Sequence, residues 1–181
     1  MSNDPKIALL RAVNVGGRSL KMNALRTMVA ELGYADVRSL MQSGNLVFRG
    51  GPADDAAAES QLEAATARHF DIQTDYLVRS ACEWRAMIDA NPFPAAAKAD
   101  PSHMVAMPLK SEVADGALAH LRTAIKGREQ VEVAGRAAYL VYPDGIGDSK
   151  LTIKIIERCL GTKGTGRNWN TVLKLAAMVE T

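Results

Sequence analysis

The order of short apolar runs and longer helical segments constrains the fold of this chain more than any other feature of its sequence. Six segments fill the first half in the order β-α-β-β-α-β, at residues 6–12, 23–32, 37–41, 45–49, 54–70 and 72–78. This order is that of the ferredoxin-like fold, in which two helices pack on one antiparallel sheet.

The second half begins with the same order and then departs from it. The pattern predicts a strand at 103–107, a helix at 111–125, a hairpin at 130–142, a helix opened by Ser149, and a last helix in place of a closing strand. The sequence therefore predicts an α+β fold of two ferredoxin-like halves, the second modified with a C-terminal helix. The predicted bounds are 1–79 for the first half, 80–102 for a helix and Pro-rich connection, and 103–181 for the second half. A single mixed sheet is the alternative architecture.

Composition indicates a soluble globular protein without a membrane segment. The chain has 181 residues, of which 48% are hydrophobic and 23% charged. Its apolar runs are too short to span a bilayer, and the N-terminal run lacks the features of a signal peptide, so a cytoplasmic location is expected. The two cysteines, Cys82 and Cys159, are expected to be small buried hydrophobes. The sequence predicts no metal site and no cofactor.

Positive charge is concentrated in two stretches near the ends of the chain. Residues 1–50 hold seven basic and three acidic side chains, and residues 147–174 hold six basic and two acidic ones. The net charge of the whole chain is only +2. If the fold brings the two stretches together, they form one basic surface that could attract phosphate groups.

The stretch GTGRNWN, at 164–170, is a candidate anion site. Its glycines let the backbone turn and approach a ligand, and Arg167 and Lys163 add positive charge beside a helix N-terminus. The alternative interpretation is structural: Asn168 or Asn170 caps the last helix, Trp169 packs into the core, and the glycines only form the turn.

Three other loops carry candidate ligand-binding residues. The first, with Arg11, Asn14, Gly16, Gly17 and Arg18, lies between a strand and a helix but matches neither a Walker A loop nor GxGxxG. The second, QSGN, holds Gln42, Ser43 and Asn45, and is most simply a hairpin turn whose amides could contact polar groups. The third runs from Asp144 to Lys150 and lacks the ligand pattern of an EF-hand.

Residues typical of catalysis are scarce. His69, His103 and His120 share no spacing and are expected to be solvated or packed. Neither a carboxylate pair nor a nucleophile elbow stands out, although Asp144 with Lys150 could serve in acid–base chemistry. The distinctive residues are Gly, Asn, Arg, Lys and Trp, which are typical of binding more than of proton transfer.

Four motifs together resemble one known family. They are IALLRAVNVGG near the start, QSGN at 42–45, YLVYPDGIGDSKL at 139–151 and GTGRNWNTVLKL at 164–175. In this order they are similar to the bacterial family catalogued as domain of unknown function 1697. The resemblance implies an α+β fold with two ferredoxin-like halves, and it implies no activity.

The leading functional hypothesis is a module that binds a phosphate-bearing ligand, either nucleic acid or a nucleotide, on a basic glycine-loop surface. The alternatives are a small-molecule enzyme with its site in the cleft between the halves, and a structural or protein-interaction module. The expected partners are nucleic acid or a phosphorylated small molecule, and the sequence does not fix an oligomeric state. The candidate ligand-binding residues are Arg11, Asn14, Gly16, Gly17, Arg18, Gln42, Ser43, Asn45, Asp144, Lys150, Arg167, Asn168, Trp169 and Asn170.

Overall fold

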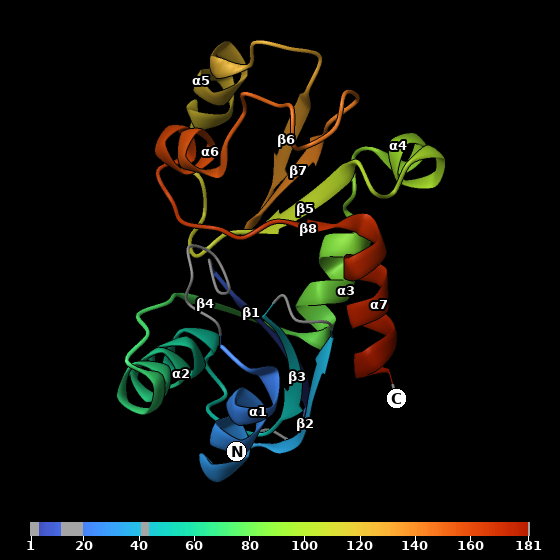
Figure 1. The fold of residues 1–181 in the computed structure, drawn as a ribbon. Helices are drawn as coiled ribbons and strands as arrows, with labels where there is room; N and C mark the ends of the chain where they lie inside the picture. Colours follow the sequence, from blue (N-terminus) through green and yellow to red (C-terminus); the bar gives the residue numbers. More distant parts are fainter. Residues whose placement is uncertain (1–3, 12–19, 41–43, 181) are drawn as a thin grey trace. The chain divides into compact units, whose positions relative to one another are not determined.

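The structure is a computed structural model of the chain, and it describes residues 4–11, 20–40 and 44–180. The chain divides into two compact units (Figure 1). Unit 1 comprises Met1–Arg85 together with Leu175–Thr181, and unit 2 comprises Ala86–Lys174. The bounds of the halves proposed from the sequence, 1–79 and 103–181, stay predictions.

Unit 1 contains a four-stranded antiparallel sheet covered by two helices. Its strands are β1 (Pro5–Leu10), β2 (Ala35–Leu40), β3 (Asn45–Arg49) and β4 (Tyr76–Ser80), and its helices are α1 (Met22–Glu31) and α2 (Asp55–Phe70). The strand order is β2-β3-β1-β4. Element order and strand order are those of a ferredoxin-like unit, so the prediction for this half is confirmed.

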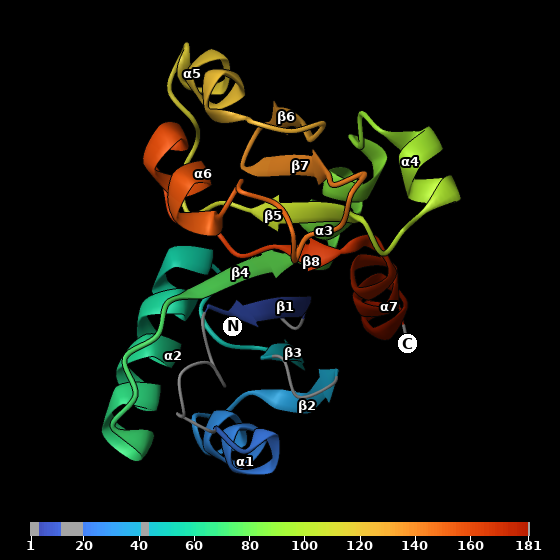
Figure 2. The same ribbon diagram turned by 45° about the horizontal axis from the view of Figure 1, so that its top comes forward.

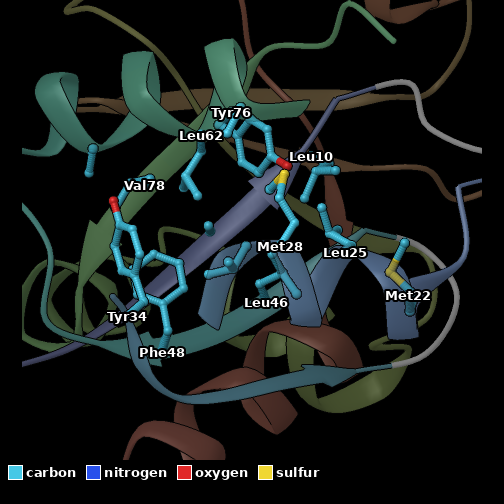
Figure 3. Close-up of a cluster of buried hydrophobic side chains, with 14 of the residues drawn as sticks. Leu10, Met22, Leu25, Met28, Tyr34, Leu46, Phe48, Leu62, Tyr76 and Val78 are labelled. Carbon is cyan, nitrogen blue, oxygen red and sulfur yellow. The ribbon is translucent and has the colours of Figure 1, made fainter. Parts of the chain in front are cut away.

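The core of unit 1 follows from the alternation of side chains along the strands. Residues such as Leu10, Phe48 and Val78 point to the face that α1 and α2 cover, where Leu25 and Leu62 pack against them (Figure 3). The neighbouring residues on each strand, such as Ile7 and Val47, are also buried. The sheet is therefore covered on both faces, which explains why β1 reads as a continuous apolar run rather than an alternating one.

Unit 2 repeats this arrangement. Its strands are β5 (Met104–Pro108), β6 (Gln130–Ala134), β7 (Ala137–Val141) and β8 (Arg167–Asn168), and its helices include α5 (Ala117–Ala124) and α6 (Ile153–Leu160). The strand order is β6-β7-β5-β8, and α5 and α6 lie side by side on one face (Figures 1 and 2). The two-residue strand β8 closes this sheet, and the sequence did not predict it.

Three further helices complete the fold: α3 (Ala81–Asp89), α4 (Pro94–Ala99) and α7 (Trp169–Val179). Helices α3 and α7 each contribute residues to both units. Helix α7 is the predicted C-terminal helix. Helix α4 falls within the Pro-rich connection. Pro94 lies in its first turn, where a helix tolerates proline.

Several local predictions were wrong for identifiable reasons. Helix α6 begins later than expected, because Thr152 caps it while the Ser149 hydroxyl binds Glu129 instead. Helix α1 begins at Met22, one residue before the predicted start at residue 23, with Lys21 at the N-cap position. Cys82 is exposed on α3, whereas Cys159 is buried as expected. Among the described residues, no helix has the length and apolar character needed to cross a membrane.

Candidate ligand-binding face of unit 2

The structure describes eight of the fourteen candidate residues. Arg11 and Asn45 lie in unit 1, and the other six lie in unit 2. The six that fall outside the described residues are Asn14, Gly16, Gly17, Arg18, Gln42 and Ser43. The role of all fourteen in ligand binding stays a prediction.

Arg11 and Asn45 lie at the same end of the unit 1 sheet. The amide of Leu10 donates to the carbonyl of Gly44 at 2.8 Å, so the end of β1 and the start of β3 are adjacent. Arg11 forms an ion pair with Asp75 at 3.2 Å. The Asn45 side chain is fully buried and donates to the carbonyl of Leu40 at 3.1 Å. This hydrogen bond joins the start of β3 to the end of β2.

The glycines of GTGRNWN are required by the packing of the sheet. A Cβ on Gly164 would lie 2.8 Å from the carbonyl oxygen of Pro108 and 2.7 Å from the Met107 side chain. A Cβ on Gly166 would lie 2.7 Å from the Val105 side chain. Both glycines let β8 approach β5 closely, on the face that α5 and α6 cover.

The residues that follow begin the last helix. The Asn168 side chain accepts the amide of Thr171 at 3.0 Å, the geometry of an N-cap, so Asn168 is the cap among the two asparagines that the sequence proposed. Trp169 is 6% exposed, and Asn170 is exposed on the first turn. The structural interpretation of this stretch thus accounts for its glycines, its first asparagine and its tryptophan.

Arg167 and Lys163 have a different environment. The pairing of Ala106 with Arg167 and of Leu109 with Gly164 sets the register between β5 and the segment that leads into β8. In this register Lys163 lies opposite Lys110, whose amide donates to the Lys163 carbonyl at 2.8 Å. Because side chains alternate between faces, Lys110, Lys163 and Arg167 all project from the face opposite α5 and α6. We refer to these three residues as the cationic row.

Arg167 is the most enclosed member of the cationic row. Its guanidinium donates to the Thr165 hydroxyl at 2.8 Å and to the Gly166 carbonyl at 2.9 Å. Burial lowers the pKa of Arg167 to about 10, because removal from water disfavours the charged form. A bound anion would offset that cost and raise the pKa again.

Asp144 and Lys150 lie at the opposite end of the unit 2 sheet. They line a hollow of about 180 Å³ between the loop that leads into β6 and the loop that follows β7. Asp144 is engaged by Arg128, whose Nε lies 3.0 Å from Oδ2, and this hydrogen bond lowers the pKa of Asp144. Lys126 and Glu129 also line the hollow, which therefore carries both signs of charge.

His103, which was expected from the sequence to be solvated or packed, contacts a carboxylate beside this hollow. Its Nδ1 lies 2.8 Å from Oδ2 of Asp100, and its Nε2 would lie 3.8 Å from a Cβ on Gly145, in the loop that lines the hollow. The Ser102 hydroxyl donates to Asp100 and, with His103, holds the pKa of that carboxyl below its usual range. The spacing Asp-x-x-His is too common to have indicated this pair. Among the described residues, no group of three or more His, Cys, Asp or Glu side chains is arranged to hold a metal ion.

Comparisons with known proteins identify the family and support the fold. None of the proteins with curated descriptions matches the chain. A solved structure titled "conserved bacterial protein SP0830 from Streptococcus pneumoniae" is similar, with a TM-score of 0.76 and 20% sequence identity over 97% of this chain and 98% of that one. At this identity the likeness concerns the fold alone. A family model described as "Protein of unknown function (DUF1697)" matches residues 4–139, so the chain belongs to this family.

Proposed function

We propose that this protein binds a phosphate-bearing ligand, a nucleotide or a nucleic acid, on the cationic row of unit 2. The observation that carries the proposal is the register that places Lys110 opposite Lys163, with Arg167 on the same face. The two adjacent backbone segments thus carry two ammonium groups and one guanidinium group, each of which can donate hydrogen bonds to a phosphate oxygen. An anion bound at the cationic row would gain these charge-assisted hydrogen bonds.

The spacing of the cationic row favours a ligand with more than one phosphate group. Lys163 and Arg167 are four residue steps apart, which in extended chain is about 13 Å between Cα atoms. Successive phosphates of a polynucleotide, or the phosphate chain of a nucleotide, could contact both ends of the cationic row. The Thr165 hydroxyl lies between them and already binds Arg167.

The proposal is tested by the binding of fluorescently labelled mixed RNA and of a panel of nucleotides, at low and high salt. Both tryptophans are buried, so replacing one of them to use the other as a fluorescent reporter would disturb the core. A labelled ligand reports binding without such a substitution. We expect the double variant Lys110→Gln/Lys163→Gln to bind RNA at least about tenfold more weakly. The slope of log affinity against log salt concentration should also become less negative by about 0.7 for each phosphate contact that is lost on single-stranded RNA.

The matched control removes two positive charges from the other face of unit 2. Lys154 and Arg158 are exposed on α6, which lies on that face, so Lys154→Gln/Arg158→Gln makes the same change in net charge. Equal losses in both double variants would mean that only net charge matters, and the cationic row would be rejected. Absence of RNA and nucleotide binding by the folded wild-type chain would reject the function itself.

A second candidate function, that of a small-molecule enzyme, is favoured by His103. Its Nδ1 contacts Asp100, and its Nε2 lies beside the loop that lines the hollow with Asp144 and Lys150, an arrangement that a general base needs. Turnover of a panel of nitrophenyl esters and phosphate esters tests this candidate. Any activity should fall in His103→Gln and persist in His120→Gln, a change at an exposed helical position; equal activity of the two variants would reject His103 as the base.

A further inference from the structure

Strand β2 of unit 1 contains a one-residue bulge that changes where its arginine points. Ala35 pairs with Arg49, but the next pair along the ladder is Arg38 with Val47, so two residues of β2 oppose one residue of β3. The extra residue is Asp36, whose φ of 51° lies in the left-handed region that aspartate tolerates better than most residues.

Without the bulge, Arg38 would project into the apolar core. An uninterrupted ladder would pair residue 38 with Leu46, which packs under α1 and α2. The bulge moves every following side chain of β2 to the other face. As a result Val37 packs against the core, and Arg38 lies on the same face as Arg49.

The two arginines line a hollow of about 380 Å³ together with Asp36 and Val37. Asp36 forms an ion pair with Arg49, with 3.4 Å between Oδ2 and Nε, and its side chain is 67% exposed. One amino group of Arg38 donates to the carbonyl of Met178 at 2.5 Å, which fixes the arginine against α7. The hollow is therefore lined by two guanidinium groups and the Asp36 carboxylate.

We propose that this hollow is an oxyanion-binding site, independent of the cationic row. Two guanidinium groups on neighbouring strands match the geometry of a phosphate or carboxylate, which each can contact with paired N–H groups. Asp36 at its rim would accept a hydrogen bond from a neighbouring hydroxyl or amino group. The ligand class is thus a small metabolite whose oxyanion lies next to an O–H or N–H donor, such as a sugar phosphate or a hydroxy acid.

The experiment follows the Nε–H signals of the ¹⁵N-labelled full chain by NMR during titration. Inorganic phosphate, acetate, glycerol 3-phosphate and lactate are the probes, which separate phosphate from carboxylate and plain anions from donor-bearing ones. We expect saturable shifts of the Arg38 and Arg49 signals. In Arg49→Gln the affinity should fall about tenfold or more, while Arg68→Gln, an exposed change on α2, should leave it unaltered.

A substitution of Asp36 should change the affinity for phosphate in the opposite direction to a substitution of Arg49. Asparagine accepts the left-handed backbone, so Asp36→Asn should keep the bulge and remove the negative charge. Inorganic phosphate should then bind several-fold more tightly than to the wild type, because the competing carboxylate is gone. Arg49→Lys serves as the replacement if Arg49→Gln does not fold, and it should weaken binding by loss of the paired N–H geometry.

Two results would overturn the proposal. One is the absence of saturable shifts at Arg38 and Arg49 with all four probes. The other is an affinity that Arg49→Gln and Asp36→Asn leave unchanged. Because RNA binding by Lys110→Gln/Lys163→Gln is measured on unit 2, the failure of one proposal is distinguishable from the failure of the other.

Discussion

The two closing strands, β4 in unit 1 and β8 in unit 2, hold the same topological place and are built differently. Both pair antiparallel with the central strand of their sheet. Strand β4 has five residues, and carboxylates accept its outward N–H groups: Glu63 binds the amide of Tyr76, and Glu59 binds that of Val78, each at 2.9 Å. Strand β8 has two residues, and one carboxylate, Glu157, binds the amide of Gly164 just before it.

The difference shows two solutions to the problem of an exposed sheet edge. Unpaired N–H groups on an edge strand invite pairing with another chain, and natural proteins cover or block them. Unit 1 blocks its edge with acidic side chains of α2. Unit 2 shortens the strand and relies on glycines to hold it close to β5, which leaves the alternate positions for Lys163 and Arg167.

The largest effect is expected from Glu59→Ala. Glu59 is 6% exposed, accepts the amide of Val78, and pairs with the buried Arg79 at 3.8 Å. Removal of one partner of a buried ion pair typically costs about 3 kcal/mol or more, because the other charge stays buried. Urea denaturation should show this loss in the free energy of unfolding. Glu63→Ala, at a half-buried position, removes the acceptor of the Tyr76 amide and should cost about 1 kcal/mol. Equal losses would show that burial of the Glu59 carboxylate is unimportant.

The second effect is expected from Gly164→Ala in unit 2. The added methyl group would lie too close to the Pro108 carbonyl, a backbone atom that cannot rotate away. Overpacking of this kind costs about 1–3 kcal/mol, and the thermal midpoint should fall accordingly. Gly147→Ala is the control, since a Cβ there meets nothing within 4 Å. A Gly164→Ala protein as stable as the control would mean that β8 can move away from β5 without cost.

The fold was largely predictable from the sequence because its signals are local. Strand β3 was predicted with the bounds Asn45–Arg49 that it has, since its run of apolar residues ends at a glycine pair. The helix predicted at 54–70 is α2, which runs from Asp55 to Phe70 with Asp54 as its N-cap, a contact between residues three apart. Such features do not depend on the rest of the chain.

Strand β8 and the cationic row could not be predicted, because both depend on partners distant in sequence. Two residues carry no periodicity, and only pairing with Val105 and Ala106 makes Arg167 and Asn168 a strand. Lys110 and Lys163 are 53 residues apart and meet only through that register. The bulge at Asp36 was equally unpredictable, because the sequence ADVRSL has the pattern of an ordinary strand.

A smaller effect concerns the helices that follow the closing strands. Each strand ends in the residue that caps the next helix: Ser80 accepts the amide of Glu83 at 3.2 Å, and Asn168 accepts that of Thr171 at 3.0 Å. Loss of an N-cap side chain costs about 1 kcal/mol. Asn168→Ala should lower the free energy of unfolding by that amount in chemical denaturation, while Asn170→Ala should be nearly neutral. The reverse order would assign the cap to Asn170.

The smallest effect is a pH dependence that arises from the coupled carboxyls Glu83 and Asp55 of unit 1. Glu83 accepts both the amide and the hydroxyl of Ser80 at 2.9 Å. Burial alone would raise the pKa of Glu83, but the hydrogen bonds from Asp55 and Ser80 outweigh it and lower the pKa to about 2. Burial and the contact with Glu83 raise the pKa of Asp55, against the opposing effect of Lys6.

These two shifts act in opposite directions on stability. A lowered carboxyl pKa contributes stability above the ordinary value, and this contribution is lost as the pH falls toward about 2. A raised carboxyl pKa contributes stability below the ordinary value, and this is lost as the pH rises through the raised one. The pair should therefore favour the folded state most in the mildly acidic range, where the two carboxyls share one proton.

The variant Glu83→Gln isolates the acid limb of this dependence. Its side-chain carbonyl can still accept from Ser80, but it cannot take up a proton as the pH falls. The free energy of unfolding of the wild type should therefore decline more steeply toward about pH 2 than that of the variant, with a difference of about 1 kcal/mol because Glu83 is partly screened by solvent. Thermal unfolding at a series of pH values measures both slopes. Parallel slopes would show that the contacts from Ser80 do not stabilise the charged form of Glu83 over its protonated form.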